Sequence, residues 1–382
     1  RQRDARSRVT SPALVRVHRY VALGLGFLVV ALGLAGAALV FRDELTPILT
    51  PAVRVSPAPV APGQYARILA AARSADPAAR SLDIAPAERA DRAAEVVVHG
   101  DRGERYLLVD PHDGTVVADN DREWLPFATL YEFHRRFLLG AAGEYAVGFT
   151  GFALAFLAVS GLVMWWPRKW KQPFRIRWDG NRLAVSYDLH KCAGATFAII
   201  LITNAAIGIA MTFDDASVAL VNRVANRASP PIPAAMSNAM ESPRSLDDIV
   251  AAANGAFPAG RVSRLAIRPG NTAVMVRKRL ATDNDTHGMN RIYVDAASAT
   301  VLHVSPVRDA APGNAMFEWL YPLHTGKLVG MPYRALLVLA GCVPLLSFVT
   351  GLIVWRSRAA RRRAAPRPDA MPATSRTSRG IP

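Results

Sequence analysis

The stretch CAGATFAIILITNAAIGIAMTF (residues 192–213) decides the fold, because it contains no Asp, Glu, Lys or Arg. Three more charge-free stretches lie at residues 20–41, 145–167 and 335–355. As α-helices these segments extend about 31–35 Å, which matches the roughly 30 Å hydrocarbon core of a bilayer. The 382-residue chain is therefore predicted to cross a membrane four times, and a single-domain soluble enzyme is excluded.

The basic excess of the chain follows this predicted topology. Residues 1–19, 168–189 and 356–382 hold 20 basic residues against four acidic ones, and they account for the whole net charge of +16. Short cytoplasmic segments collect Lys and Arg, so these segments are predicted to be a cytoplasmic tail, loop and tail, the last one disordered. The excess thus indicates topology within a lipid bilayer, and no nucleic-acid partner is expected.

The chain is also a duplication, because a set of residues around the second and fourth spans recurs without gaps at the same offsets. The two matching sets are Tyr131, His134, Gly140, Gly161, Trp165 and Tyr321, His324, Gly330, Gly351, Trp355. A weaker match relates the first and third spans, where Gly36 follows His18 at the same offset as Gly208 follows His190. Both copies run in the same direction, which predicts a parallel repeat about an axis along the membrane normal.

Each copy consists of a span, an extramembrane domain and a second span with an outer extension. The first copy comprises residues 20–41, 42–128 and 129–167, and the second comprises 190–213, 214–316 and 317–355. Both domains are predicted to be small α+β modules: Ala-rich helices at residues 63–74 and 246–256 precede alternating strands such as 95–99, 104–110, 273–277 and 291–295. The fold class is thus a four-helix transmembrane bundle with two α+β domains on the far side of the membrane.

Four of the eight histidines stand at the entrances of the four spans. His18 and His190 lie just before charge-free stretches on the cytoplasmic side, and His134 and His324 lie about three helical turns before theirs on the outer side. Each face of the membrane therefore has one histidine from each copy. Pairs of imidazoles that face each other across a helix bundle are typical axial ligands of haem iron.

Cations beside the outer histidines suit the carboxylates of such a haem. Arg135, Arg136 and Lys327 follow an outer histidine closely, and charge-assisted hydrogen bonds to haem propionates are expected of them. The depth of the outer pair is open: either the helices protrude beyond the membrane, or Gly140 and Gly330 break them and the histidines fold back. The other histidines, at 99, 112, 287 and 303, are expected to be solvated polar residues.

These features resemble the PepSY-associated transmembrane family of bacterial inner-membrane proteins. The resemblance rests on the runs VSGLVMWWPR (159–168) and PLHTGK (322–327), on the histidine entrances and on the Ala-rich helix followed by Tyr-x-Val-Asp strands. It covers about residues 14–358. The family fold it implies has two linked haem-binding halves with periplasmic PepSY domains.

Within that family, the length and layout resemble the ferric-siderophore reductases. This resemblance implies a protein with two b-type haems, held by the pairs His18 with His190 and His134 with His324. Electrons would pass to a ferric siderophore in the periplasm, and the donor would be a membrane quinol or a cytoplasmic flavoprotein. Two other classes stay open at this point: a permease for the intact siderophore and a PepSY-type regulatory or chaperone-like membrane protein.

Overall fold

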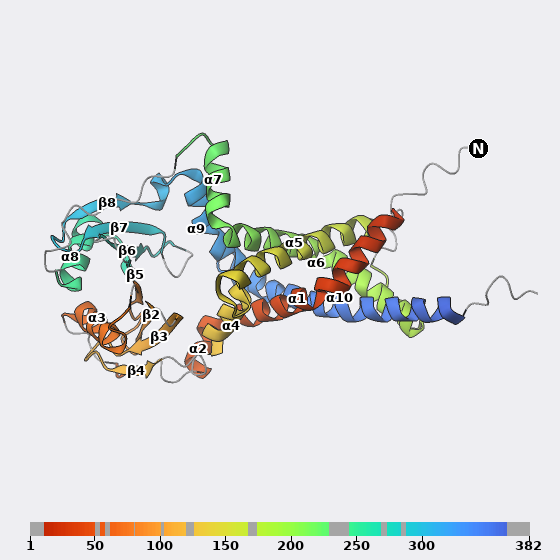
Figure 1. The fold of residues 1–382 in the computed structure, drawn as a ribbon, viewed down its shortest axis with the longest axis horizontal. Coiled ribbons are helices and arrows are strands. Elements are labelled where there is room, and N and C mark those ends of the chain that lie inside the picture. The colour runs from red at the N-terminus through yellow and green to blue at the C-terminus, as the bar shows by residue number, and fades with distance from the viewer. Residues whose placement is uncertain are drawn as a thin grey trace, which may run out of the picture.

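Four long helices form a bundle, and a sheet domain stands beyond one end of it (Figure 1). The bundle helices are α1 (Pro12–Leu39), α5 (Gly140–Trp165), α6 (Arg182–Thr212) and α10 (Met331–Ala364), and all four are long and apolar enough to cross a membrane. The computed structural model describes residues 11–49, 54–57, 62–79, 81–100, 103–119, 126–166, 174–228, 244–268, 273–283 and 288–364. We call the end of the bundle near the sheet the sheet side and the other end the distal side.

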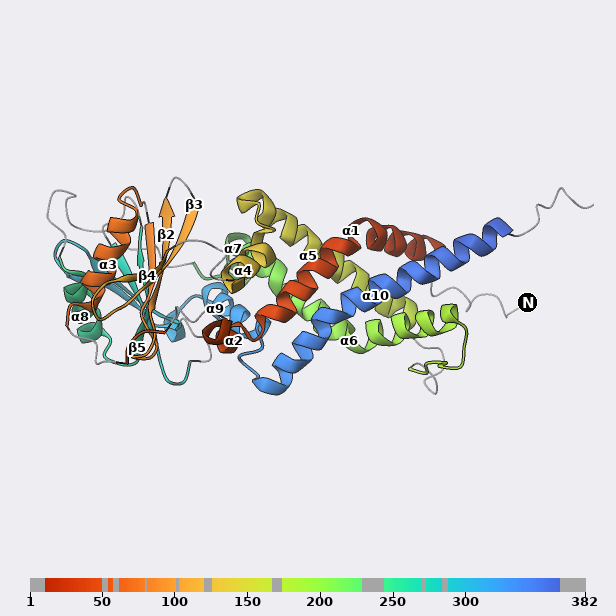
Figure 2. The same cartoon turned by 90° about the horizontal axis from the view of Figure 1, so that it is seen from below.

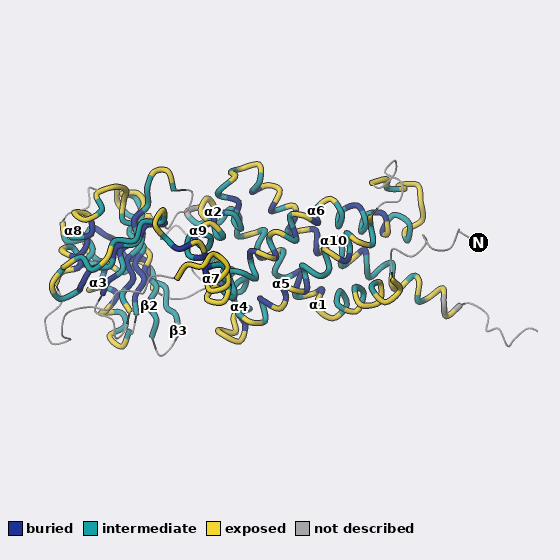
Figure 3. Tube along the Cα trace, turned by 90° about the horizontal axis from the view of Figure 1, so that it is seen from above, coloured by how far each residue is buried: buried dark blue, intermediate teal, exposed yellow. Residues whose placement is uncertain are grey.

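The bundle surface is apolar because it faces lipid. Large side chains such as Phe27, Phe149 and Ile199 are well exposed along the bundle, whereas the sheet domain buries its apolar residues in one compact core (Figure 3). Inside the bundle small residues allow close helix packing. At the crossing of α1 and α10, a Cβ on Gly33 would lie 2.7 Å from the carbonyl oxygen of Gly341, so only glycine fits there.

The helices follow the predicted duplication. Around the bundle α1 packs against α5 and α10, and α6 packs against the same two helices, so the equivalent helices α1 and α6 lie diagonally across from each other. This arrangement places the first helices of both copies on either side of the central axis, as a parallel repeat requires.

Three helices extend beyond their predicted boundaries, because helical hydrogen bonding continues past the charge-free stretches. Helix α1 begins at Pro12, within the predicted tail 1–19, where the Ser11 side chain caps it by accepting from the Ala13 amide. Helix α6 begins at Arg182, within the predicted loop 168–189, and is capped by Asn181. Helix α10 continues to Ala364, so the predicted disordered tail 356–382 is partly helical, and residues 365–382 lie outside the described part.

The outer extensions are short separate helices. The predicted segment 129–167 divides into α4 (Pro126–Arg136) and α5, and its counterpart 317–355 divides into α9 (Pro312–His324) and α10. The backbone reverses between them through left-handed residues, with φ of +60° at Gly140 and +93° at Gly330. Short helices α2 (Arg42–Leu49) and α7 (Asp214–Val224) follow α1 and α6, and α7 stands across the bundle axis (Figure 1).

The two predicted α+β modules share a single antiparallel sheet of eight strands in the order β4-β3-β2-β1-β5-β6-β7-β8. The strands are β1 (Ser81–Ala85), β2 (Ala94–Gly100), β3 (Gly103–Val109), β4 (Val116–Asp119), β5 (Arg261–Ile267), β6 (Ala273–Arg279), β7 (Asn290–Asp295) and β8 (Val301–Ser305). The modules join where β1 pairs with β5, with Ile84 opposite Leu265. Helices α3 (Gln64–Ala75) and α8 (Leu246–Ala256) cover the face that points away from the bundle (Figure 2).

The other face of the sheet points toward the bundle, so we call it the bundle face. It is anchored to the short helices by ion pairs. Glu104 of β3 pairs with Arg136 of α4 at 3.2 Å, and Glu318 of α9 pairs with two arginines of the sheet. The two helices that carry the predicted outer histidines are therefore the ones that hold the sheet domain.

Candidate functional site

The structure brings the four predicted histidines together in the two predicted pairs. The ring centroids of His18 and His190 lie 6.5 Å apart, and those of His134 and His324 lie 6.2 Å apart. The first pair joins α1 and α6 on the distal side, and the second joins α4 and α9 on the sheet side. Each pair thus takes one ring from each copy of the repeat, and the rings meet inside the bundle.

The sheet-side pair is folded back into the bundle, which settles its depth. The Nδ1 atom of His134 lies 3.1 Å from the carbonyl oxygen of Leu32. Leu32 lies two turns before the last residue of α1, which corresponds to about 10 Å inside the end of that helix. The break at Gly140 therefore lets α4 fold back against the bundle. His134 and His324 thus lie within the length of the bundle helices and not beyond their ends.

Glycines of the repeat make room for all four rings. The nearest neighbour of a Cβ on Gly36 would be Cε1 of His134 at 3.0 Å, and on Gly208 it would be Cε1 of His324 at 3.7 Å. Gly161 and Gly351 face His18 and His190 in the same way, at 3.7 Å and 3.4 Å. The sequence shows these glycines only as repeat markers. They let a helix backbone approach each imidazole. At Gly36 the approach is too close for an added methyl group, whereas at the other three positions a methyl group would make an ordinary contact.

Hydrogen bonds fix the tautomer of three rings. Carbonyl oxygens can only accept, so His134 Nδ1 donates to Leu32, and His190 Nδ1 donates to the Ser347 carbonyl at 2.9 Å. The Ser160 hydroxyl donates to the Phe156 carbonyl, so it accepts from His18 Nδ1 at 2.7 Å. The proton is therefore on Nδ1, and Nε2 keeps the lone pair that binds a metal ion.

Ser160 and its repeat counterpart Thr350 were not recognised as site residues in the sequence. The hydroxyl of Thr350 lies 3.3 Å from His190 Nδ1, in the place that Ser160 has beside His18. Both residues directly precede a repeat glycine, Gly161 or Gly351. A hydroxyl in the same position of both copies, next to a glycine, was the available signal.

The fourth ring differs from the other three. The Nδ1 atom of His324 is buried and has no hydrogen-bond partner among the described residues. The counterpart of Leu32 in the second copy is Asn204, whose side chain lies beside the Tyr333 hydroxyl instead of offering His324 a backbone carbonyl. A buried polar atom without a partner costs free energy, which indicates that this side of the pair is completed by something other than the chain.

The ring separation of both pairs would allow the two histidines of a pair to hold one metal ion between them. Two imidazoles that each bind a metal at about 2 Å hold their centroids roughly 6 Å apart, as both pairs do. In the described residues no group of three or more His, Cys, Asp and Glu gathers around a point. Each pair therefore offers two ligands, and the rest of an iron coordination sphere would come from a macrocycle such as haem.

The three predicted propionate ligands already have carboxylate partners. Lys327 pairs with Asp43 at 2.6 Å, and Arg136 pairs with Glu104 and Glu144 at 3.2 and 3.1 Å. Arg135 lies 3.6 Å from Glu144. These cations lie beside the sheet-side pair, as the sequence indicates, and their contacts in this structure tie the short helices to α2, α5 and the sheet.

A sequence model of the PepSY-associated TM region matches residues 15–358, which is most of the chain. The chain belongs to the PepSY-associated transmembrane family. Among curated proteins, no match is found. The family match and the four candidate membrane helices confirm the predicted family and fold class, namely a membrane protein with a four-helix bundle and a sheet-containing domain.

One histidine outside the pairs is partly exposed, at 32%, and also has two carboxylate partners that the sequence did not predict. His99 lies between Asp83 and Glu104 on the bundle face, at 3.1 and 3.5 Å, because strand pairing brings the three side chains close together. Its hydrogen bond to Asp83, followed by the one to Glu104, raises the pKa of His99 to about 9. His303 is exposed as predicted, His112 is partly exposed, and His287 lies outside the described residues of this PepSY-family chain.

Proposed function

We propose that this membrane protein is a dihaem reductase that passes electrons across the bacterial inner membrane to ferric siderophores in the periplasm. The observation that supports it most directly is the occurrence of two histidine pairs, one toward each end of the bundle. His18 with His190 would hold the cytoplasmic-side haem b, and His134 with His324 the periplasmic-side one. Bound haem would supply one-electron redox chemistry at each site.

The chain would set the properties of these sites through its own residues. The Nδ1 hydrogen bonds to Ser160, Ser347 and Leu32 orient the rings and make the opposite nitrogens better donors. The apolar bundle and the surrounding lipid would limit the access of water to both pairs. His18 and Leu32 stand almost four turns apart on α1, which separates the two levels by about 21 Å. Two haem sites at this spacing would divide the transfer of an electron across the membrane into shorter steps.

The proposed orientation has the sheet domain in the periplasm. The start of α1, the start of α6 and the end of α10 lie at the distal end of the bundle and carry Arg16, Arg182 and Arg358, and Lys and Arg collect on the cytoplasmic side. A membrane quinol or a cytoplasmic flavoprotein would supply electrons on that side. Reduction of hard ferric iron to ferrous iron weakens its bonds to the oxygen donors of a siderophore, so the metal would be released.

The test uses the purified protein, reduced with dithionite under anaerobic conditions and freed of excess reductant. On addition of a ferric siderophore we expect the reduced haem bands to return to the oxidised form while a ferrous chelator develops colour in proportion. Gallium(III)-loaded siderophore is the control, because gallium(III) is not reduced under these conditions. Haem bands that respond equally to the iron and gallium complexes, or to neither, would refute the proposal.

A further inference from the structure

A row of three arginines crosses the bundle face of the sheet. In the strand register Arg264 of β5 lies opposite Arg277 of β6, and Arg277 lies opposite Arg291 of β7. Residues directly opposite each other in a sheet point to the same face, so the three side chains lie together. Like charges in this position are destabilising, and the row therefore has an energetic cost.

The first copy of the repeat shows what the fold requires at these positions. The two copies are aligned by a shared turn, in which the Asp110 amide donates to the Thr115 carbonyl and the Asp295 amide donates to the Thr300 carbonyl. Counting back from these turns through the strand pairing, the row in the first copy consists of Asp83, Val97 and Tyr106. That row contains no arginine, so the same framework is built without the three cations and the second copy alone carries them.

The carboxylates around the row neutralise only part of its charge. Glu318 of α9 pairs with both Arg277 and Arg291. Asp83 lies 3.5 Å from Arg264 and also pairs with Arg268 at 2.9 Å. These four guanidinium groups pair with these two carboxylates, Asp83 also pairs with His99, and Glu95 is a further carboxylate that acts on Arg264. The contact of Arg264 with Asp83 is made by its buried Nε and is an ion pair without a hydrogen bond.

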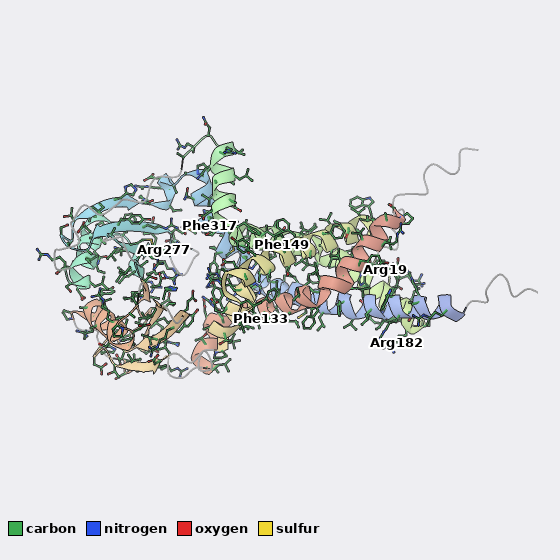
Figure 4. The ribbon with its side chains drawn as sticks, viewed as in Figure 1. Arg19, Phe133, Phe149, Arg182, Arg277 and Phe317 are labelled. Atoms are coloured by element: carbon green, nitrogen blue, oxygen red, sulfur yellow. The ribbon has the colours of Figure 1, made fainter. Side chains whose placement is uncertain are left out.

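The row is accessible and lies on the bundle side of the sheet. The side chains of Arg264 and Arg291 are each 30% exposed, so a ligand reaches both. Figure 4 shows Arg277 on the side of the sheet near α9, the helix that ends at His324. A parallel row beside the arginines includes Tyr293 and His303, whose rings are 6.4 Å apart.

We propose that Arg264, Arg277 and Arg291 form the binding site for the anionic oxygen donors of the iron chelate. Guanidinium forks bind planar, negatively charged oxygen pairs in two-point contacts, and Tyr293 and His303 offer flat surfaces to aromatic or amide groups of the same ligand. This inference rests on the proposed reductase function and adds the substrate class. The preferred chelates are negatively charged catecholate or carboxylate complexes, over neutral hydroxamate complexes of similar size.

Binding is measured apart from electron transfer, by calorimetry with gallium(III) complexes on the full-length haem-loaded protein. The probes are a gallium tris-catecholate, which is anionic, and a gallium trihydroxamate, which is near neutral. We expect Arg264→Gln and Arg291→Gln each to weaken tris-catecholate binding about tenfold or more, because each removes a charge-assisted contact. Trihydroxamate binding stays within about twofold of wild type in both variants.

The matched control is Arg105→Gln, because Arg105 of β3 has a similar exposure of 31% and pairs with Asp119 away from the row. This variant is expected to bind both probes like wild type, and the haem spectrum of each variant confirms that it is folded. Equal tris-catecholate affinity in wild type and both row variants would overturn the proposal. If the row variants lose binding of the gallium tris-catecholate, but the iron complex does not reoxidise the haems of the wild type, the binding site is upheld and the reductase function is refuted.

Discussion

Replacing Gly36 by alanine tests the sheet-side pair without touching a ligand. The added methyl group would lie 3.0 Å from Cε1 of His134, whereas ordinary van der Waals contact begins at 3.4 Å. The ring or helix α1 must therefore move by a few tenths of an ångström. The ring has little freedom to do so, because its Nδ1 is hydrogen-bonded to Leu32 on the same helix.

The size of the effect follows from this displacement. Ligand distances in metal sites hold to about 0.2 Å, so the shift exceeds what a histidine–iron bond tolerates. Overpacking of this kind costs about 1–3 kcal/mol. When this cost falls on the haem-bound state, the affinity of the sheet-side pair for haem decreases roughly 5- to 150-fold.

The assay is haem content by pyridine haemochrome together with low-temperature EPR of the ferric protein. We expect Gly36→Ala to lose part of one haem, or to convert one low-spin signal to high spin, while the distal signal is unchanged. Gly208→Ala is the repeat-matched control: its methyl group would lie 3.7 Å from Cε1 of His324, an ordinary contact, so both haems are retained. Two unchanged low-spin signals in Gly36→Ala would refute the reasoning.

Three further predictions concern the hydrogen bonds and ion pairs. Ser160→Ala removes the described acceptor of His18 Nδ1, so a redox titration should show a higher reduction potential of the distal haem. Thr350→Val should change this potential less, because the Ser347 carbonyl remains 2.9 Å from His190 Nδ1. Protonated His99 stabilises the sheet domain fully below pH 6.5, its ordinary pKa, and this stabilisation is lost as the pH rises through about 9. Between pH 6.5 and 9 the melting temperature should therefore fall more in wild type than in His99→Gln. Parallel curves of melting temperature against pH would contradict this prediction. Glu318 is only 7% exposed, so Glu318→Gln should lower the free energy of unfolding in chemical denaturation by about 3–5 kcal/mol. Glu88 is 55% exposed, so Glu88→Gln should lower it by less than about 1 kcal/mol. Equal losses of stability in the two variants would show that Glu318 does not anchor α9 to the sheet.

The membrane helices and the histidine pairs were predictable because their signals are local. Absence of charge over the length of a bilayer-spanning helix defines a span. The repeat is defined by tyrosine, glycine and tryptophan residues that lie at the same sequence offsets from His134 and from His324. Equivalent residues of a parallel repeat are related by its axis and lie at the same membrane depth, which made the pairing of His18 with His190 a natural prediction, and the structure shows their rings 6.5 Å apart. The helices α3 and α8 and the strands β2, β3, β6 and β7 were predicted from composition and alternation in the same way, whereas β1, β4, β5 and β8 were not.

What the sequence did not predict depends on contacts between distant segments. The single sheet arises from the pairing of β1 with β5, whose residues Ile84 and Leu265 are far apart in the chain. The fold-back of His134 required the position of Leu32, and the choice between a protruding and a broken helix could not be made from Gly140 alone. The arginine row is visible only once register places residues 264, 277 and 291 side by side.

The haem content of the purified protein tests the central claim most directly. The account predicts about two haems b per chain from haem-sufficient cells, all low-spin, and about one in either His134→Ala or His190→Ala. The haem that remains should differ between these two variants in its EPR signal, because each removes a ligand of a different pair. A colourless wild-type protein, or one that keeps two low-spin haems when either histidine is replaced, would contradict the account.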